Sequence, residues 1–196
     1  MSSLPQQRLT LQEYLAGERV SETRHEYFCG EVFQMAGGTR RHNSIALNIA
    51  AAAMREVRPR GCDVQAMDMR VRVPSGLYTY PDVVVFCGQP QFEDATEDTL
   101  LNPLVIIEVL SPSTEGYDRG KKFERYAELP SLRQYVLVAQ GEPRVTSMLR
   151  QDVQTMWTWS QAIGIDAELE LTPLGVRLRL SEIYERVDFT SGEASI

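Results

Sequence analysis

Tyr80-Pro81-Asp82-Val83-Val84-Val85 decides the fold together with a second apolar segment, Val105-Ile106-Ile107-Glu108-Val109-Leu110. Both segments are almost entirely apolar, which is typical of central strands whose two faces are covered. Pro81 stands at the start of its run, where a strand tolerates proline. We therefore predict two core strands, over 82–86 and 104–110.

Each predicted strand carries one acid, Asp82 at the start of the first and Glu108 inside the second. An ionised carboxylate is costly to bury unless it has a counter-charge or a metal. If the strands are adjacent, both acids can converge on one Mg²⁺ or Mn²⁺, with carboxylates roughly 4–6 Å apart and oxygen–metal distances near 2.1 Å. The alternative for Glu108 is a buried ion pair with an arginine.

Lys121 and Lys122 are the only lysines, and the other 18 of the 20 basic side chains are arginines. Lysine differs from arginine in having a compact charge whose pKa can move. In a predicted helix over 117–129, Lys122 lies roughly 90° from the centre of the apolar face and Lys121 roughly 170° away. Lys122 is therefore the candidate working residue, and Lys121 faces solvent or a phosphate backbone. A lysine-poor codon bias with two leftovers is the alternative.

The remaining pattern predicts a single α/β domain, in which helices flank a mixed sheet that continues into a C-terminal antiparallel β extension. Helices are expected over 10–17, 21–30, 43–57 and 181–186. Further strands are expected over 31–35, 62–73, 134–139, 144–150, 153–160, 168–171 and 176–180. The domain would span 8–186, followed by a disordered tail at 187–196. Trp157 and Trp159 share a strand face, which favours core or dimer packing over base stacking.

Composition excludes several classes of protein. The net charge of −7 argues against coating nucleic acid by bulk electrostatics, although a local basic groove remains compatible. The three cysteines form no C-x-x-C pair, which is typical of a reducing cytosol and argues against a zinc site or a disulfide framework. No signal peptide and no apolar run of about 18 residues is present, so we expect a cytoplasmic protein with no membrane partner.

Pro81-Asp82 followed by Glu108-Val109-Leu110 resembles the signature of the PD-(D/E)XK nucleases, with Leu110 at the position of the usual lysine. The chain is more closely similar to the bacterial Uma-type restriction endonuclease family. In that family the segment resembles Glu108-Val109-Leu110-Ser111-Pro112-Ser113-Thr114, and the lysine stands on the next helix, in a stretch like Asp118-Arg119-Gly120-Lys121-Lys122. The resemblance extends over roughly residues 9–184.

The resemblance implies a restriction-endonuclease-like core in which Asp82 and Glu108 hold magnesium and Lys122 stands near the attacking water. Glu26, expected on the helix before the first core strand, matches an additional acid of the family; its alternative is an ordinary surface glutamate. His42 is expected either to contact phosphate or to cap its helix.

Two functions from different classes follow. The first is a Mg²⁺-dependent endonuclease that hydrolyses DNA and works as a homodimer. Its phosphate contacts would come from basic side chains at the mouth of the site, although these could also be simply solvated: Arg40, Arg41, His42, Arg119, Lys121 and Arg125. The second is a non-catalytic nucleic-acid-binding or assembly protein that retains the nuclease fold.

Overall fold

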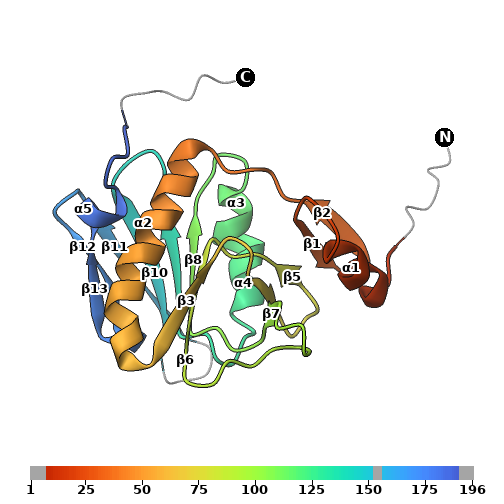
Figure 1. Cartoon of the computed structure of the whole chain (residues 1–196). Coiled ribbons are helices and arrows are strands. Elements are labelled where there is room, and N and C mark those ends of the chain that lie inside the picture. Colours follow the sequence, from red (N-terminus) through yellow and green to blue (C-terminus); the bar gives the residue numbers. More distant parts are fainter. Residues whose placement is uncertain (1–7, 152–155, 190–196) are drawn as a thin grey trace.

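The computed structural model describes residues 8–151 and 156–189. Its centre is a six-stranded sheet in the order β11-β10-β9-β8-β6-β3, with α2 on one face and the helical segment from α3 to α4 on the other (Figure 1). The strands are β3 (Cys62–Ala66), β6 (Val83–Cys87), β8 (Val105–Val109), β9 (Gln134–Val138), β10 (Arg144–Arg150) and β11 (Trp157–Ile163). Among the described strands of this sheet, β8 and β9 form the one parallel pair, and the other neighbours are antiparallel. The predicted mixed sheet flanked by helices is confirmed.

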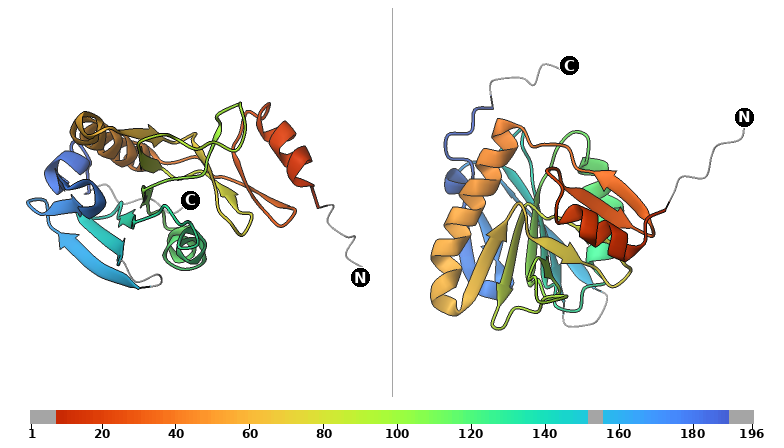
Figure 2. Two further views of the ribbon diagram at one scale, coloured as in Figure 1. Left: turned by 90° about the horizontal axis from the view of Figure 1, so that it is seen from below. Right: turned by 45° about the vertical axis from the view of Figure 1, so that its right-hand side comes forward.

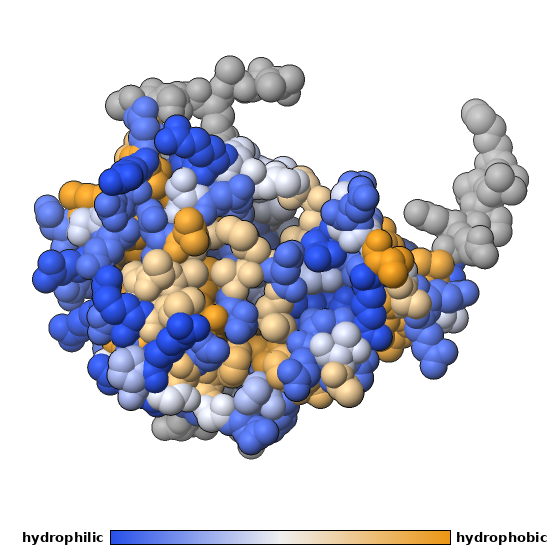
Figure 3. Space-filling model, viewed as in Figure 1, coloured by the Kyte–Doolittle hydropathy of each residue, from blue (hydrophilic) through white to orange (hydrophobic). Residues whose placement is uncertain are grey.

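Alternation along the central strands divides the core into two layers. On the α2 side, Val83, Val85 and Ile107 pack against the helix α2 (Arg40–Val57). On the opposite side, Val84 and Ile106 pack with Tyr126. Because both faces are covered, nearly every residue of these strands is apolar. Hydrophobic side chains over α2 form the centre of the face in Figure 3, surrounded by hydrophilic ones.

A smaller five-stranded sheet, in the order β2-β1-β5-β4-β7, joins the N-terminal part of the chain to the core. Its strands are β1 (His25–Phe28), β2 (Glu31–Gln34), β4 (Arg70–Arg72), β5 (Tyr78–Thr79) and β7 (Thr99–Leu100). The helix α1 (Leu11–Glu18) begins with a capping box of Thr10 and Glu13, close to the start of the helix predicted over 10–17. Figure 2 shows α1 and the β1–β2 hairpin to one side of the six-stranded sheet.

The remaining elements lie after the core strands. The helical segment after β8 consists of α3 (Glu115–Tyr117), a π-helical turn η2 (Asp118–Lys122) and α4 (Phe123–Tyr126). The hairpin β12–β13 (Glu168–Leu171, Val176–Arg179) turns through η3 (Thr172–Leu174), and α5 (Leu180–Ile183) follows. The turn η1 (Arg58–Arg60) ends α2. Of the predicted tail, residues 190–196 lie outside the described residues, whereas Val187 and Phe189 pack against the core.

The helix predicted over 21–30 is wrong, because this segment forms the strand β1 and its turn. Cys29 and Gly30 both have positive φ, of 51° and 88°, and connect Phe28 to Glu31 as a two-residue hairpin loop. Such turns match the twist of paired strands. Tyr27 is buried against Tyr14 and Tyr78, so aromatic packing outweighs the helix-start signal at Ser21.

Two further predictions need correction. The strand expected over 62–73 is two strands, because Met67 has a φ of 67° and interrupts the extended backbone between β3 and β4. Cys62 and Cys87 face each other on β3 and β6 and form a disulfide, contrary to the inference from cysteine count. Their 25-residue separation conceals this pairing until the strand register is known. The strand predicted over 153–160 is β11, and residues 152–155 lie outside the described residues.

Candidate active site

Asp82 and Glu108 lie on the same face of the six-stranded sheet. Val83 of β6 pairs with Ile107 of β8, so the antiparallel register places Asp82 opposite Glu108. Side chains directly opposite each other in such a pair point to the same face. Val84, two residues after Asp82, packs in the same core layer as Tyr126. Tyr126 in turn contacts Glu108. The two acids therefore share the face that the α3–α4 segment covers.

Lys122 reaches this pair of acids from the π-helical turn. Its Nζ lies 2.9 Å from Oε1 of Glu108, and the lysine is 5% exposed. Lys121 is exposed. The predicted helix is present, but its π-helical turn is not evident from an apolar pattern, because that pattern assumes a constant angle per residue. π-Helical turns within α-helices are frequent at functional sites.

Two further acids complete a cluster around Lys122. Oε1 of Glu26 and Oδ1 of Asp118 each lie 3.5 Å from its Nζ. Asp118 precedes Lys122 by one helical turn, so the spacing brings them to the same side. Tyr126, one turn further on, donates its hydroxyl to Oε1 of Glu108 at 2.9 Å. The counter-charge of Glu108 is thus a lysine, whereas the alternative considered from sequence was an arginine.

Burial and mutual charge control protonation in this cluster. Burial raises the pKa of Glu108 to about 8, although Lys122 opposes that shift. Burial also raises the pKa of Asp118, again against Lys122. Burial alone would lower the pKa of Lys122, but the surrounding Glu108, Tyr126, Glu26 and Asp118 raise it well above its ordinary value. Lys122 is therefore a permanent cation, whereas Glu108 is the acid most easily neutralised.

Glu26 enters the site from the strand β1, rather than from a helix as predicted. Thr79 of β5 donates its hydroxyl to Oε1 of Glu26, the oxygen that also faces Lys122. Nearby, the guanidinium of Arg125 lies 3.6 Å from the ring centre of Phe28 at the end of β1. These contacts hold the hairpin next to the α3–α4 segment (Figure 2).

Asp82 is oriented by two hydrogen bonds, one to each oxygen. The backbone N–H of Val109 donates to Oδ2 at 2.7 Å, and His42 Nε2 lies 2.8 Å from Oδ1. His42 itself is fixed by Gln140, whose Nε2 lies 3.3 Å from Nδ1 of the ring and 2.6 Å from the carbonyl oxygen of Leu110. The carbonyl oxygen of Leu110 accepts a hydrogen bond, so the Gln140 atom facing it is the amide nitrogen, which is a donor. The same nitrogen donates to Nδ1 of His42. The proton of the His42 ring is therefore on Nε2, which donates to Asp82.

The donor set of Asp82 and Glu108 is compatible with magnesium. Magnesium prefers oxygen ligands and is commonly bound through one or two carboxylates, with water and substrate phosphate supplying the rest. Within residues 8–151 and 156–189, no group of three or more His, Cys, Asp or Glu side chains is placed to hold a metal ion, so a cation here would take its remaining ligands from water and substrate. Both hydrogen bonds to Glu108 from the cluster fall on Oε1.

The residues predicted to contact nucleic acid are placed differently from one another. His42 contacts Asp82, and the helix is capped by Thr39 instead, so the capping alternative for His42 is wrong. Arg125 contacts Phe28 and the hydroxyl of Tyr117. Arg40 and Lys121 are exposed. Arg41 and Arg119 line a pocket beside the acids, where Arg119 pairs with Glu115 at 2.8 Å.

Four contributing residues are absent from the predicted set. Asp118 and Tyr126 share an edge of the helix with Lys122 at four-residue spacing, and this periodicity could have identified them. Thr79 and Gln140 carry no sequence signal of this kind, because their roles depend on strand pairing and on the chain direction after β9. They are the partners of Glu26 and His42, respectively.

Comparisons with known proteins show which family the chain matches and which proteins it is similar to. The family described as "Uma2: Putative restriction endonuclease" matches residues 11–181. Two proteins of Synechocystis sp. PCC 6803 are similar to this chain. The first, slr1290, is 32% identical over 188 residues, covering 95% of this chain and 97% of the relative. The second, sll1609, is 33% identical over 165 residues, covering 84% and 93%.

A solved structure shares the fold. The crystal structure of "a putative nuclease belonging to DUF820" from Anabaena variabilis ATCC 29413 superposes with a TM-score of 0.73. The match covers 90% of this chain and 97% of that protein, at 19% sequence identity. At this identity the similarity shows that the two proteins share a fold.

Proposed function

The chain belongs to the Uma2 family, described as "Putative restriction endonuclease", and from this we propose that it is a metal-dependent endonuclease that hydrolyses phosphodiester bonds of DNA. The observation that carries the proposal is the contact between Lys122 and Glu108, at 2.9 Å on the sheet face shared with Asp82. The lysine stands on the helix after β8, and Leu110 occupies the strand position where the related signature has its lysine. This arrangement supports a nuclease site in which the acids come from two strands and the cation from a helix.

Asp82 and Glu108 would hold Mg²⁺ or Mn²⁺. A bound divalent cation would stabilise charge developing on the phosphate and lower the pKa of a coordinated water. Lys122 contributes a fixed positive charge that can donate a hydrogen bond to the attacking water or to a phosphate oxygen. Glu26 and Asp118 keep that ammonium protonated and in place. His42 and Val109 fix both oxygens of Asp82.

Plasmid cleavage tests the proposal directly. Supercoiled DNA incubated with the protein and Mg²⁺ or Mn²⁺ should be nicked, and a chelator should stop the reaction. Glu108→Gln and Lys122→Ala should each slow cleavage by roughly 10²-fold or more, the effect of losing one preorganised electrostatic contact. Lys121→Ala is the matched control, because it removes a neighbouring lysine that is exposed.

The controls separate this site from contamination and from the second hypothesis. A contaminating nuclease would leave the rate unchanged in Lys122→Ala. Equal cleavage by wild type and Lys122→Ala would favour the alternative, a nucleic-acid-binding or assembly protein that keeps the nuclease fold. A circular dichroism spectrum and a melting curve for each variant would show that lost activity does not reflect unfolding.

We further propose that the enzyme acts as a homodimer in the cytoplasm. Two symmetry-related sites are the simplest means of cutting both strands of a duplex, and two-fold dimers are the commonest oligomers. Among the described residues, no helix is long and apolar enough to cross a membrane. In a reducing compartment Cys62 and Cys87 would be kept as thiols.

A further inference from the structure

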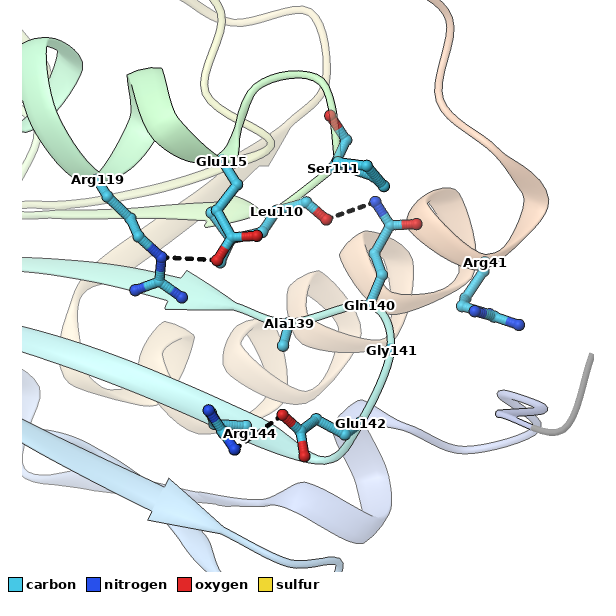
Figure 4. Close-up of a pocket in the computed structure, with 11 residues that line it drawn as sticks. Arg41, Leu110, Ser111, Glu115, Arg119, Ala139, Gln140, Gly141, Glu142 and Arg144 are labelled. Atoms are coloured by element: carbon cyan, nitrogen blue, oxygen red, sulfur yellow. Dashed lines mark hydrogen bonds and ion pairs between the residues drawn. The ribbon is translucent and has the colours of Figure 1, made fainter. Parts of the chain in front are cut away.

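A pocket of about 460 Å³ opens beside the acid cluster, at the carboxyl ends of β8 and β9 (Figure 4). Leu110 and Ala139, which directly follow these two strands, form part of its wall. In open α/β sheets, ligands commonly bind outside the carboxyl ends of parallel strands. The volume is within the range of roughly 300–1,000 Å³ found for small-molecule sites. The pocket is therefore large enough for a nucleotide unit.

Arginines from three separate elements line this pocket. Arg41 comes from the start of α2, Arg119 from the π-helical turn and Arg144 from the start of β10. The balancing acids are Glu115, 2.8 Å from Nε of Arg119, and Glu142, 2.9 Å from Nη2 of Arg144. A guanidinium has five N–H donors in a planar fork, so one such bond leaves donors for a phosphate.

The negative charge of the neighbouring acid cluster means that a phosphate-bearing strand needs a favourable contact elsewhere, which this pocket can supply. Around Lys122 stand three carboxylates, those of Glu26, Glu108 and Asp118, and Asp82 shares the same face. Such a cluster repels the phosphates of a nucleic-acid strand. A strand that crosses it needs hydrogen-bond donors with positive charge on an adjacent surface, and the guanidinium groups of Arg119 and Arg144 each have N–H donors left beside the carboxylate that they contact.

Gln140 connects the two sites physically. It lines the pocket, and its Nε2 contacts both the carbonyl oxygen of Leu110 and Nδ1 of His42. The other ring nitrogen of His42 contacts Asp82. Gln140 thus lies between the pocket and His42, the histidine that contacts Asp82. The pocket and the acid cluster are therefore close enough for a single nucleic-acid strand to occupy both sites.

We propose that this pocket binds a phosphate of the nucleic-acid strand, next to the phosphate that lies over the acids, and that Arg144 is one of its ligands together with Arg41 and Arg119. This inference rests on the proposed function for the identity of the ligand. It assigns a role to Arg144, which the sequence pattern did not single out, and defines a second anchoring point for the strand. Arg125 is not part of this pocket, because its guanidinium is engaged with Phe28.

Binding measurements without cleavage test the pocket. Fluorescence anisotropy of a labelled oligonucleotide, in buffer with EDTA, should show roughly 10-fold weaker binding for Arg144→Gln and for Arg119→Gln, the loss of about one charge-assisted contact. The slope of log K against log salt should fall by roughly 0.7 for single strands or 0.9 for duplex. Arg177→Gln is the matched control, an exposed arginine on β13.

The variants should remain folded. The backbone N–H and carbonyl of Arg144 bond the hydroxyl of Tyr184, and these contacts do not involve the arginine side chain. Inorganic phosphate and a nucleoside 5′-monophosphate, titrated as competitors, distinguish the source of the phosphate. Displacement of the oligonucleotide by the monophosphate at lower concentration than by inorganic phosphate supports a site for a nucleotide of the strand; a weaker effect of the monophosphate contradicts it.

The inference and the proposed function fail in different ways. Unchanged affinity and salt slope in Arg144→Gln and Arg119→Gln would overturn the pocket, even if wild type cleaves DNA. Metal-dependent cleavage that is unaffected by Lys122→Ala would overturn the proposed function, even if both arginine variants bind weakly. A wild-type protein that shows no binding to either single-stranded or duplex DNA overturns both.

Discussion

His42 Nε2 lies 2.8 Å from Oδ1 of Asp82 and joins the start of α2 to the start of β6 across 40 residues of sequence. Gly38 allows this approach. A Cβ on Gly38 would lie 2.9 Å from Cδ2 of His42 and 2.5 Å from Oδ1 of Asn43, whereas a Cβ on Gly37 would meet nothing within 4 Å. The position of the histidine ring therefore depends on one glycine and not on its neighbour.

Gly38→Ala should consequently displace His42 and slow DNA cleavage by roughly 10-fold or more, the usual effect of losing a residue that orients a metal-binding carboxylate. Gly37→Ala should cleave at the wild-type rate. Initial rates of plasmid nicking, together with the ring ¹⁵N shifts of His42, measure both effects. Equal rates for the two alanine variants would show that the His42–Asp82 contact does not matter for turnover.

Removal of the buried cation should destabilise the protein in a pH-dependent manner. Lys122→Met leaves Glu108, Glu26 and Asp118 without their counter-charge, which costs about 3–5 kcal/mol for a broken buried pair. The pKa of Glu108 is raised in the folded protein, to about 8. Its protonation therefore contributes to the free energy of unfolding in full below the pKa of the unfolded chain, and this contribution is lost as pH rises through the folded pKa.

Urea unfolding of Lys122→Met should therefore show the largest loss at pH 8 and a smaller one near pH 5, because Glu108 becomes protonated. Lys121→Met removes an exposed lysine and serves as the control, with little change at either pH. A loss in Lys122→Met that is the same at both pH values would mean that the acids are not responsible.

Tyr126→Phe isolates the hydrogen bond to Glu108. Its hydroxyl donates to Oε1 at 2.9 Å in a fully buried setting, so its removal should lower the free energy of unfolding by about 1–2 kcal/mol. Cleavage should slow several-fold, since Lys122 still holds Glu108. Tyr27→Phe removes a comparable hydroxyl that donates to Leu9, away from the acids. It should reduce stability and leave the cleavage rate intact in assays below its melting temperature.

Acid should release α1 and β1 from the loop between β6 and β7, which carries Asp94 and Asp98. Hydrogen bonds from Arg19 lower the pKa of Asp94 to about 2; the same arginine, with Arg70, outweighs burial and lowers the pKa of Asp98. A lowered folded pKa contributes stability that is present above the unfolded pKa near 3.9 and is lost as pH falls through the folded value.

Hydrogen exchange of α1 and β1 should thus accelerate between about pH 4 and pH 2, beyond the intrinsic effect of pH. Asp94→Asn combined with Asp98→Asn should show fast exchange of these elements already at pH 6. Protection of α1 in the double variant equal to that of wild type would show that the loop acids do not hold this part of the chain.

Trp159 provides the test of the proposed dimer. It lies on β11, at the edge of the six-stranded sheet, is 56% exposed, and contacts Phe123 on the helix of Lys122. An exposed strand edge with a large aromatic side chain is suited to pairing with a second chain. Light scattering should report a dimer for wild type and more monomer for Trp159→Lys. A wild-type monomer throughout the micromolar range contradicts the proposal.

The central strands and the helix of Lys122 could be predicted because each is decided by local pattern. The apolar runs at 82–86 and 104–110 indicated the strands, and the single pair of lysines directed attention to the helix that follows them. The resemblance to the Uma-type family was also confirmed. Helical periodicity favoured Lys122 over Lys121, and the structure has Lys122 against Glu108.

Features that depend on tertiary pairing could not be predicted in the same way. The pattern predicts a helix over 21–30 that includes Glu26, yet the buried aromatic contacts of Tyr27 favour a strand. Gln140 and Arg144 have no distinctive local sequence context; they reach the site because β9 and β10 are joined by a short turn at its edge. The π-helical turn equally breaks the regular period on which sequence reasoning relies.

The acid cluster and the side chains that support it come from positions as far apart as Glu26 and Gln140, and they are therefore synthesised at different times. A chain emerging from the ribosome, at roughly 5–20 residues per second, exposes β1 several seconds before β9 is complete. Until Gln140 is available, the ring of His42 lacks the contact at Nδ1 that fixes it against Asp82. A truncated translation product that stops before β9 would therefore carry all four acids and Lys122, but neither the strand that pairs with β8 nor the Gln140 that contacts His42.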